Sequence, residues 1–432
     1  MTSYEDLMHS DGTTAYETFS VIMPSAFIIF ITGLVISKFF RKNVRLQLIL
    51  EFVLIVIPLV LIVTVLAKYA TNIIILLIII SITLMGFLRN RTDLSCHQKR
   101  KNYNYITSAR GIIFVLTVIS ILAVDFPIFP RHFTKTRDYG YSLMDVGVGL
   151  YVYGGGILAY NINSKVKSIK NSLINAIPLI ILGCGRFIVT KEIDYQVITS
   201  EYGVHWNFFL TLATTQILSS FILNTIKCST IYVGGALLLV HECFLQLGLA
   251  RFVLSNAERD TFLKANREGI VSSLGYLGLY FLSVGFGKFI DVKNTGAKFS
   301  WKLLFKYCSS IGFLLWATFI LEKNFGISRR LANSGYCIWI LFIGVFMVAL
   351  LYVLELLQNY VFGCTYVPLI FEAINYNPLT FFLTANLLTG AINIVFDTLS
   401  MNWLQSLVIL ILYMMFNCVL SYFWFMKRIR LK

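Results

Sequence analysis

Apolar runs of about 20 residues recur along almost the whole chain, separated by short polar segments. A helix of about 20 residues crosses the roughly 30 Å of hydrocarbon in a bilayer, and the shorter alternating pattern of membrane barrel strands is absent. The pattern therefore predicts an all-α, polytopic membrane helical bundle. The thirteen predicted transmembrane helices are residues 19–40, 46–67, 70–88, 108–124, 143–162, 172–190, 204–223, 229–249, 269–287, 303–321, 334–357, 378–397 and 404–426.

Composition agrees with a membrane protein, because 57% of the residues are hydrophobic and only 13% are charged, against about 25% charged in soluble domains. The connecting segments are too short for a soluble domain, so residues 1–432 are predicted to form a single integral membrane domain with short tails at 1–18 and 427–432. The net charge of +15 is spread over these segments, which argues against nucleic-acid binding. The eight cysteines include no CxxC pair, and neither disulfides nor a metal site are expected.

The distribution of Lys and Arg predicts the orientation of the chain. The first 37 residues contain neither, and a basic cluster at 38–45 follows the first span. Cytosolic loops are enriched in Lys and Arg, so we expect a luminal N-terminus, no cleaved signal peptide and, after thirteen crossings, a cytosolic C-terminus. The basic segments 89–101 and 427–432 fit this topology, whereas the predicted cytosolic segment 358–377 contains no basic residue.

Four predicted luminal loops keep basic residues on the side where they are normally depleted: 125–142, 191–207, 250–269 and 322–335. Positive charge retained there suggests an anion to bind. In the first of these loops, Asp125 directly follows an apolar span, where burial raises a carboxyl pKa and a neighbouring cation lowers it. Two prolines stop the helix just beyond it. Asp125 is therefore placed as a tunable base.

Further polar side chains lie at span ends or inside spans. Arginines suit bidentate binding of phosphate, and helix N-termini add amide donors, although paired surface charges and helix capping give the same pattern without a ligand. Asn386 and Asn393 share one helix face, either against a neighbouring helix or in a polar cavity. The candidate substrate-binding residues are Arg131, His132, Asp145, Tyr202, Asn266, Arg267, Glu268, Arg329, Arg330, Asn333, Asn386 and Asn393.

Six sequence blocks together resemble the GPI inositol acyltransferase family, which includes the GPI-anchored wall transfer proteins of fungi. The blocks are AVDFPIFPRHFTKT, YSLMDVGVG, EYGVHWNFF, ANREGIVSSLGYLG, SRRLANSGYCIW and FLTANLLTGAIN. The resemblance implies a multi-pass enzyme of the endoplasmic reticulum membrane with thirteen spans and luminal motif loops. It also implies transfer of a fatty acyl group, typically palmitoyl, from acyl-CoA to the inositol of glucosaminyl-phosphatidylinositol. Acyl-CoA is then a co-substrate, and no bound cofactor is expected.

Acyl transfer from a thioester to a hydroxyl needs a base, a cation or donor for the developing oxyanion, and a slot for the chain. Because a thiolate leaves readily and no GxSxG motif is present, we expect direct transfer without a covalent enzyme intermediate. Asp125 is the predicted base and Lys135 the predicted cation. The alternative makes His205 the base with Asn207 beside it, by analogy with membrane-bound O-acyltransferases. The acyl chain is expected to lie in an apolar groove between spans.

Two other classes of protein compete with this interpretation. A polytopic lipid or small-molecule transporter, or a scramblase, also carries buried polar residues, but carriers usually show an internal duplication, and no motif recurs between the two halves of the chain. A non-catalytic assembly subunit is the third possibility. Such a subunit would consume no acyl-CoA when purified.

Overall fold

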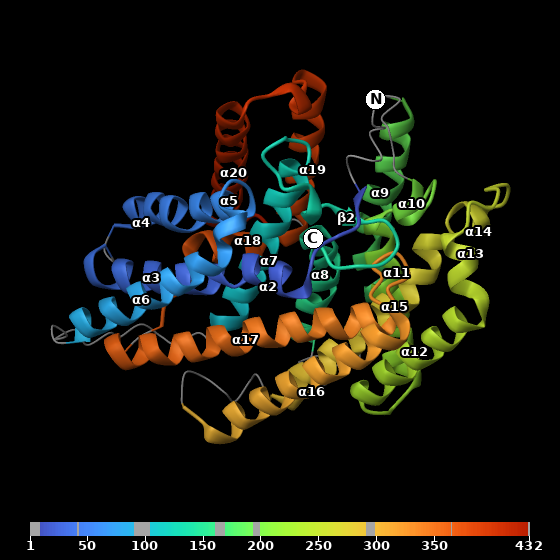
Figure 1. Ribbon diagram of the computed structural model, residues 1–432, viewed down its shortest axis with the longest axis horizontal. Coiled ribbons are helices and arrows are strands. Elements are labelled where there is room, and N and C mark those ends of the chain that lie inside the picture. The colour runs from blue at the N-terminus through green and yellow to red at the C-terminus, as the bar shows by residue number, and fades with distance from the viewer. Residues whose placement is uncertain are drawn as a thin grey trace.

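The computed structural model describes residues 9–40, 43–89, 104–159, 169–192, 199–290, 299–363 and 365–430. These residues are almost entirely helical (Figure 1). The helices that correspond to the thirteen predicted spans are α2 and α3 (Ala15–Ile22, Pro24–Phe39), α4 and α5 (Val44–Glu51, Ile57–Val63, joined by a π-helical turn), α6 (Ala70–Arg89), α7 (Asn104–Ala123), α8 (Leu143–Ala159), α9 (Ile169–Glu192), α11 (Phe208–Thr225), α12 (Thr230–Phe244), α15 (Arg267–Phe289), α16 (Trp301–Phe325), α17 (Ser334–Phe362), α19 (Pro378–Val395) and α20 (Trp403–Met426).

The remaining elements are short and belong to the connecting segments. The predicted loop 358–377 contains a further helix, and the polar loops hold several short helices and two strands. They are β1 (His9–Ser10), β2 (Lys135–Thr136), α10 (Thr199–Tyr202), α13 (Ala250–Leu254), α14 (Phe262–Ala265) and α18 (Leu369–Tyr376).

Eleven of the thirteen predicted spans are long and apolar enough to cross a membrane, as judged within the described residues. The two others are α8, whose described helix has 17 residues, and α9, which carries Lys170 and Arg186 among its 24 residues. The last residues of the predicted span 143–162, and parts of both terminal tails, lie outside the described residues. The chain is a polytopic helical membrane protein.

Small residues allow the helices that carry the polar loops to approach closely. A Cβ atom on Gly275 of α15 would lie 2.0 Å from the carbonyl oxygen of Ala332 in the loop before α17. Where α8 crosses α15, a Cβ on Gly156 would lie 2.8 Å from the carbonyl oxygen of Tyr280. Small residues are typical of such crossings, because they bring backbones into direct contact. The loops at these helix ends are therefore held together.

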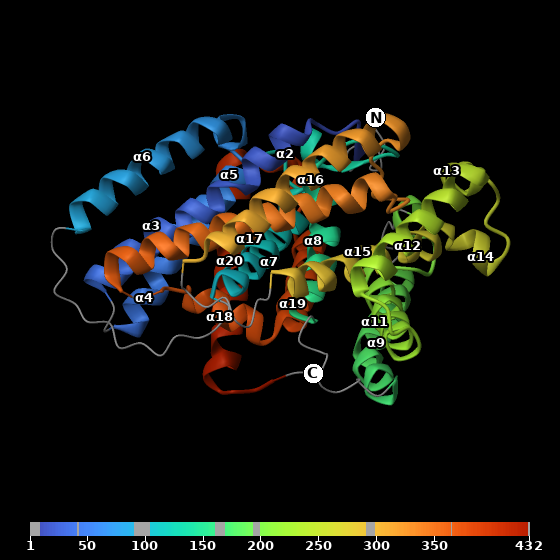
Figure 2. The same cartoon turned by 90° about the horizontal axis from the view of Figure 1, so that it is seen from below.

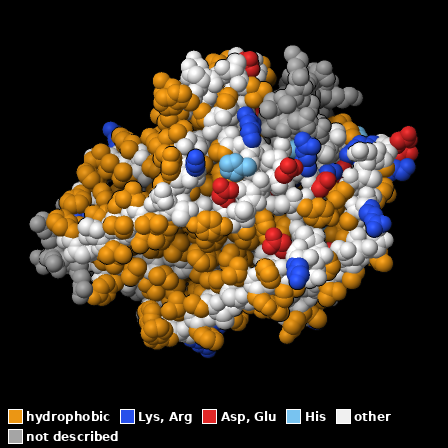
Figure 3. Space-filling model, viewed as in Figure 1, with side chains coloured by type: hydrophobic (Ala, Val, Ile, Leu, Met, Phe, Trp, Pro, Cys, Tyr) orange, Lys and Arg blue, Asp and Glu red, His pale blue; other side chains and the backbone are white. Residues whose placement is uncertain are grey.

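Backbone hydrogen bonds join the four polar loops in two pairs, and the ion pair between Lys135 and Glu201 connects one pair to the other. The amide of Val204 donates to the carbonyl of Ala265 at 2.9 Å, and the amide of Gly140 donates to the carbonyl of Ile327 at 2.9 Å. In Figure 3 the charged and His side chains gather over the middle and right of the molecule, where β2, α10 and α14 lie in Figure 1, whereas hydrophobic side chains cover the left and lower parts. The loops predicted to share one side of the membrane thus meet at one end of the bundle.

The N-terminal segment packs onto the first of these loops. Strand β1 pairs in parallel with β2, so that His9 lies opposite Lys135, and the amide of Thr13 donates to the carbonyl of Tyr141 at 2.7 Å. Figure 2, seen from below, shows α2, the helix that follows this segment, next to the start of α6, where the hydroxyl oxygens of Tyr16 and Thr71 lie 3.1 Å apart. The N-terminal segment therefore binds the loop that carries Lys135 at two places, β2 and Tyr141.

The close approach at Gly275 predicts a measurable loss of stability for Gly275→Ala. The added methyl group cannot fit against a backbone carbonyl without displacing it, so we expect destabilisation of about 1–3 kcal/mol, in the range of overpacked cores. Thermal unfolding of the purified protein in detergent measures this. Gly312→Ala in α16 is the matched control, because nothing lies within 4 Å of its Cβ position. Equal unfolding midpoints for the two variants would contradict this description of the contact.

Candidate active site

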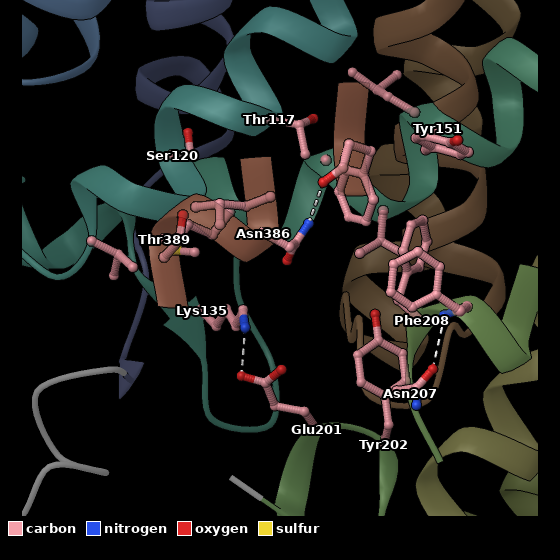
Figure 4. Close-up of a pocket in the computed structure, with 18 of the residues that line it drawn as sticks. Thr117, Ser120, Lys135, Tyr151, Glu201, Tyr202, Asn207, Phe208, Asn386 and Thr389 are labelled. Carbon is pink, nitrogen blue, oxygen red and sulfur yellow. Dashed lines mark hydrogen bonds and ion pairs between the residues drawn. The ribbon is translucent and has the colours of Figure 1, made fainter. Parts of the chain in front are cut away.

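A cavity of about 660 Å³ lies between the helices beneath the joined polar loops. Most of its wall is apolar and comes from α7, α8 and α19, with smaller contributions from α9, α11 and α17. One end of the cavity is polar. Figure 4 shows Lys135 and Glu201 facing each other across this end, with Tyr202 and Asn207 beside them. Among the described residues, the charged side chains that line the cavity are Asp125, Lys135, Arg186, Glu201 and Arg329.

The apolar part of the cavity follows α7 for most of its length. Lining residues occur at every third or fourth position from Ala109 to Asp125, a spacing that places them on one helix face. Sixteen steps along a helix cover about 24 Å, more than the roughly 15 Å thickness of one hydrocarbon leaflet. The cavity is therefore long enough to take one extended lipid chain.

Asp125 lies just past the end of α7 and faces the polar end of the cavity. Helix α7 stops at Ala123, as the two prolines predicted, and the guanidinium of Arg131 caps it by donating to the carbonyls of Val124 at 2.8 Å and Phe126 at 3.1 Å. The side chain of Asn393 donates to the Asp125 carboxylate at 2.9 Å. Asp125 is only 6% exposed, so its carboxylate is held in one position.

Burial raises the pKa of Asp125 to about 6 from its ordinary value of 3.8. The hydrogen bond from Asn393 and the charges of Lys135 and Arg131 lower this pKa, but they do not cancel the effect of burial. A carboxyl group with a pKa near 6 is largely ionised at neutral pH and still basic enough to accept a proton from a substrate. This is the electrostatic setting expected of a general base.

Lys135 forms an ion pair with Glu201 across the polar end of the cavity. The ammonium nitrogen lies 2.5 Å from Glu201 Oε1, and the two side chains are 28% and 13% exposed. Burial raises the pKa of Glu201, but the charges of Lys135 and Arg329 outweigh that effect and lower the pKa to about 2. Glu201 therefore keeps its negative charge and orients the Lys135 ammonium group.

Arg329 reaches the cavity from the loop before α17 and is anchored by Asp145. Its Nε donates to Asp145 Oδ1 at 2.7 Å, and both side chains are nearly inaccessible to solvent. Burial lowers the pKa of Arg329, but the charges of Asp145 and Glu201 outweigh it and raise the pKa above its ordinary value. The guanidinium lies 5.8 Å from the centre of the Tyr202 ring. Tyr202 lines the cavity with it, and burial raises the pKa of the phenol to about 12.

The alternative pair, His205 and Asn207, also lines the cavity. The Asn207 amide is occupied by structural bonds, since its oxygen accepts from Phe209 and Leu210 at the start of α11 and its nitrogen donates to the carbonyl of Gly183. The His205 ring centre lies 4.9 Å from that of Phe187. Both residues are therefore near the polar end, but the amide of Asn207 is used in joining α11 to α9.

Asn386 lines the cavity, as do Tyr202 and Arg329, whereas the other nine predicted binding residues lie outside its lining. The guanidinium of Arg267 donates to three backbone carbonyls between residues 253 and 257. The side-chain oxygen of Asn266 accepts from the amides of His205 and Trp206. Asn266 is itself fully buried. For these residues a role in substrate binding stays a prediction. The predicted residues outside the lining are Arg131, His132, Asp145, Asn266, Arg267, Glu268, Arg330, Asn333 and Asn393.

Several of the residues outside the lining stabilise the loops that form the site. Glu268 pairs with Arg259 at 2.6 Å, and Arg330 pairs with Asp138 at 2.5 Å. Asn333 accepts from the amides of Ser328 and Tyr336 and so starts α17. His132 is exposed and lies against Phe133.

Comparison with known proteins identifies the family. The GWT1 family model matches residues 5–424. The chain belongs to the GWT1 family. It is 36% identical over 343 residues to GPI-anchored wall transfer protein 1 of Schizosaccharomyces pombe, covering 76% of this chain and 73% of that protein. It is 30% identical over 481 residues to the glucosaminyl-phosphatidylinositol-acyltransferase PIGW of Mus musculus, covering 95% of each chain.

Two charged residues of this GWT1-family cavity were missed by the sequence analysis. Glu201 stands in the block EYGVHWNFF, but an acidic residue at a span start gives no sign that it pairs with Lys135, 66 positions away. Arg186 lies inside a predicted apolar span. The rule that intramembrane charge marks a function, which selected Asp145, would also have selected Arg186.

The ion pair predicts an energetic coupling between Lys135 and Glu201. In a double-mutant cycle with Lys135→Met and Glu201→Gln, we expect a coupling of about 1–2 kcal/mol in thermal unfolding at neutral pH, between the values typical of surface and buried pairs.

The ionisation of Glu201 also predicts how stability depends on pH. A carboxyl group with a lowered pKa stabilises the fold above its ordinary pKa of 4.5. The stability difference between wild type and Glu201→Gln should therefore shrink as the pH falls from 4.5 towards 2.

The exposed pair Asp260 and Lys264, whose side chains are 51% and 43% exposed, serves as the control for this cycle. Solvent screens it, so its coupling should be much smaller than that of Lys135 and Glu201. Equal couplings for the two pairs would show that Glu201 does not hold Lys135 in place.

Proposed function

We propose that this chain transfers a fatty acyl group from acyl-CoA to an inositol hydroxyl of glucosaminyl-phosphatidylinositol during GPI-anchor biosynthesis. The names of its relatives support this activity, and membership of the GWT1 family favours an acyltransferase over a transporter or scramblase. The GPI pathway favours the endoplasmic reticulum membrane as its location.

The proposal depends most on one observation: a carboxylate and an ammonium group lie together at the polar end of a long apolar cavity. The apolar part suits a fatty acyl chain. A thioester carbonyl at the polar end would then lie next to Asp125 and Lys135. The two chemical roles needed for acyl transfer, a base and a cation, are thus supplied at the end of the chain-binding slot.

In the proposed reaction the inositol oxygen attacks the thioester carbonyl carbon. Asp125 accepts the hydroxyl proton as the new C–O bond forms. The Lys135 ammonium group stabilises the negative charge on the carbonyl oxygen and then on the departing thiolate. The C–S bond breaks, and CoA leaves as a thiolate that takes up the proton. Glu201 orients Lys135, and Arg329, which also lines the cavity, favours the ionised form of Glu201.

We place the polar end of the cavity on the luminal side and count α8 and α9 among thirteen spans. Two features support this orientation: the absence of Lys and Arg before Lys38, and the alternation of the four polar loops with the basic segments. His205 remains the alternative base, because its ring also faces the cavity.

Activity of the purified protein separates the three classes of function. In detergent or vesicles that contain the acceptor lipid, the enzyme should release free CoA from acyl-CoA and form an inositol-acylated product. A transporter or scramblase would move lipid without releasing CoA. An assembly subunit would do neither without its partners.

Replacement of Asp125 by Asn tests the base directly. We expect the rate of acyl transfer to fall by about 10²–10⁴-fold, the usual contribution of general-base catalysis. The rate of the wild-type enzyme should rise with pH through about 6, since Asp125 must be ionised and burial raises its pKa to about that value. Rates measured between pH 5 and 8 with purified protein check both expectations.

The fold of Asp125→Asn should be at least as stable as that of the wild type, because the substitution removes a charge that burial disfavours. Unfolding midpoints therefore distinguish loss of chemistry from loss of structure. His205→Gln is the matched variant for the alternative base. Full activity in Asp125→Asn together with inactivity in His205→Gln would overturn the assignment.

A further inference from the structure

Strongly exposed residues of α9 and α19 are part of the cavity lining. On α19 the lining residues Leu387 and Ile394 are 64% and 65% exposed. On α9 the lining residue Arg186 is also exposed. Exposed lining residues on both helices are expected where a cavity opens laterally, so we take α9 and α19 to flank a lateral opening.

Part of α9 and part of α19 pack into the same buried apolar cluster, which contains Ala176 and Leu179 of α9 and Phe382 of α19. Arg186 and Ile394 lie further along these helices, outside that cluster. Pro178 lies inside α9, and a proline in a helix interior bends it.

Arg186 places a positive charge at the edge of this opening. It is exposed, it lines the cavity, and its charge acts on the buried hydroxyl of Tyr202. Gly183, one turn earlier, accepts a hydrogen bond from the Asn207 amide at 2.7 Å, which holds this part of α9 against α11. Charged residues inside membrane helices are costly and usually serve binding or transport.

We propose that this lateral opening admits the acceptor lipid and that Arg186 binds the phosphodiester of its headgroup. The inference deepens the proposed function and depends on it. An acceptor with two acyl chains stays anchored in the bilayer, so its headgroup must approach Asp125 from the side while its chains remain outside. The exposed apolar residues Leu387 and Ile394 suit those chains, and a guanidinium suits a phosphodiester. The closed, apolar part along α7 then remains for the acyl chain of the donor.

Steady-state kinetics of purified Arg186→Gln test the assignment, with acceptor lipid and acyl-CoA varied separately. We expect the KM for the acceptor to rise about tenfold or more, with KM for acyl-CoA and kcat nearly unchanged, because the lost interaction binds acceptor in ground state and transition state alike. Arg186→Lys should restore part of the affinity, since it keeps the charge without the bidentate geometry.

Arg251→Gln, at an exposed arginine of α13 away from the cavity lining, is the matched control and should leave both KM values unchanged. Narrowing of the opening by Ala391→Trp should likewise impair use of the acceptor while leaving acyl-CoA binding intact. A rise in KM for acyl-CoA alone, or no change in either KM, would overturn the assignment. Failure of the proposed function itself would look different, because the wild-type protein would then release no CoA.

Discussion

The buried ion pair between Asp145 and Arg329 is the interaction on which the polar end of the cavity depends. Asp145 accepts from Arg329 Nε at 2.7 Å, and also from the amide and hydroxyl of Thr136, the residue after Lys135. One carboxylate at the start of α8 therefore fixes both the loop before α17 and strand β2. Removal of either residue would leave an uncompensated charge in a low-dielectric interior, which strongly destabilises a fold.

From this pair the charges continue in an alternating order around the cavity. Arg329 favours the ionised form of Glu201, Glu201 binds Lys135, and Lys135 lowers the pKa of Asp125 against the effect of burial. Asp145, Arg329, Glu201 and Lys135 come from different segments of the chain, whereas Asp125 shares a loop with Lys135. This arrangement gives a structural role to one basic residue in each of two polar loops, Lys135 and Arg329. It also leaves the Lys135 ammonium group and the Asp125 carboxylate at fixed positions facing one apolar slot.

The sequence predicted the helices well because their signal is local. Runs of about 20 apolar residues and the end of α7 just before Asp125 both depend on neighbours along the chain. The meeting of the polar loops was also predictable, since alternate crossings return to the same side. Which polar residues face the cavity was not. Arg267 and Arg329 occupy similar positions near the start of a span. Arg267 nevertheless donates to backbone carbonyls, whereas Arg329 lines the cavity. Only the packing of α15 against the loop before α17 decides this.

The proposed reaction requires the donor acyl chain to occupy the slot along α7, with its thioester at the polar end. A structure of the purified protein with a non-hydrolysable acyl-CoA analogue tests it most directly. The account predicts the chain alongside Ile113 and Leu116, with the thioester position within hydrogen-bond reach of Lys135 and next to Asp125. An acyl chain bound on the lipid-facing surface, or a thioester far from Asp125, would contradict it.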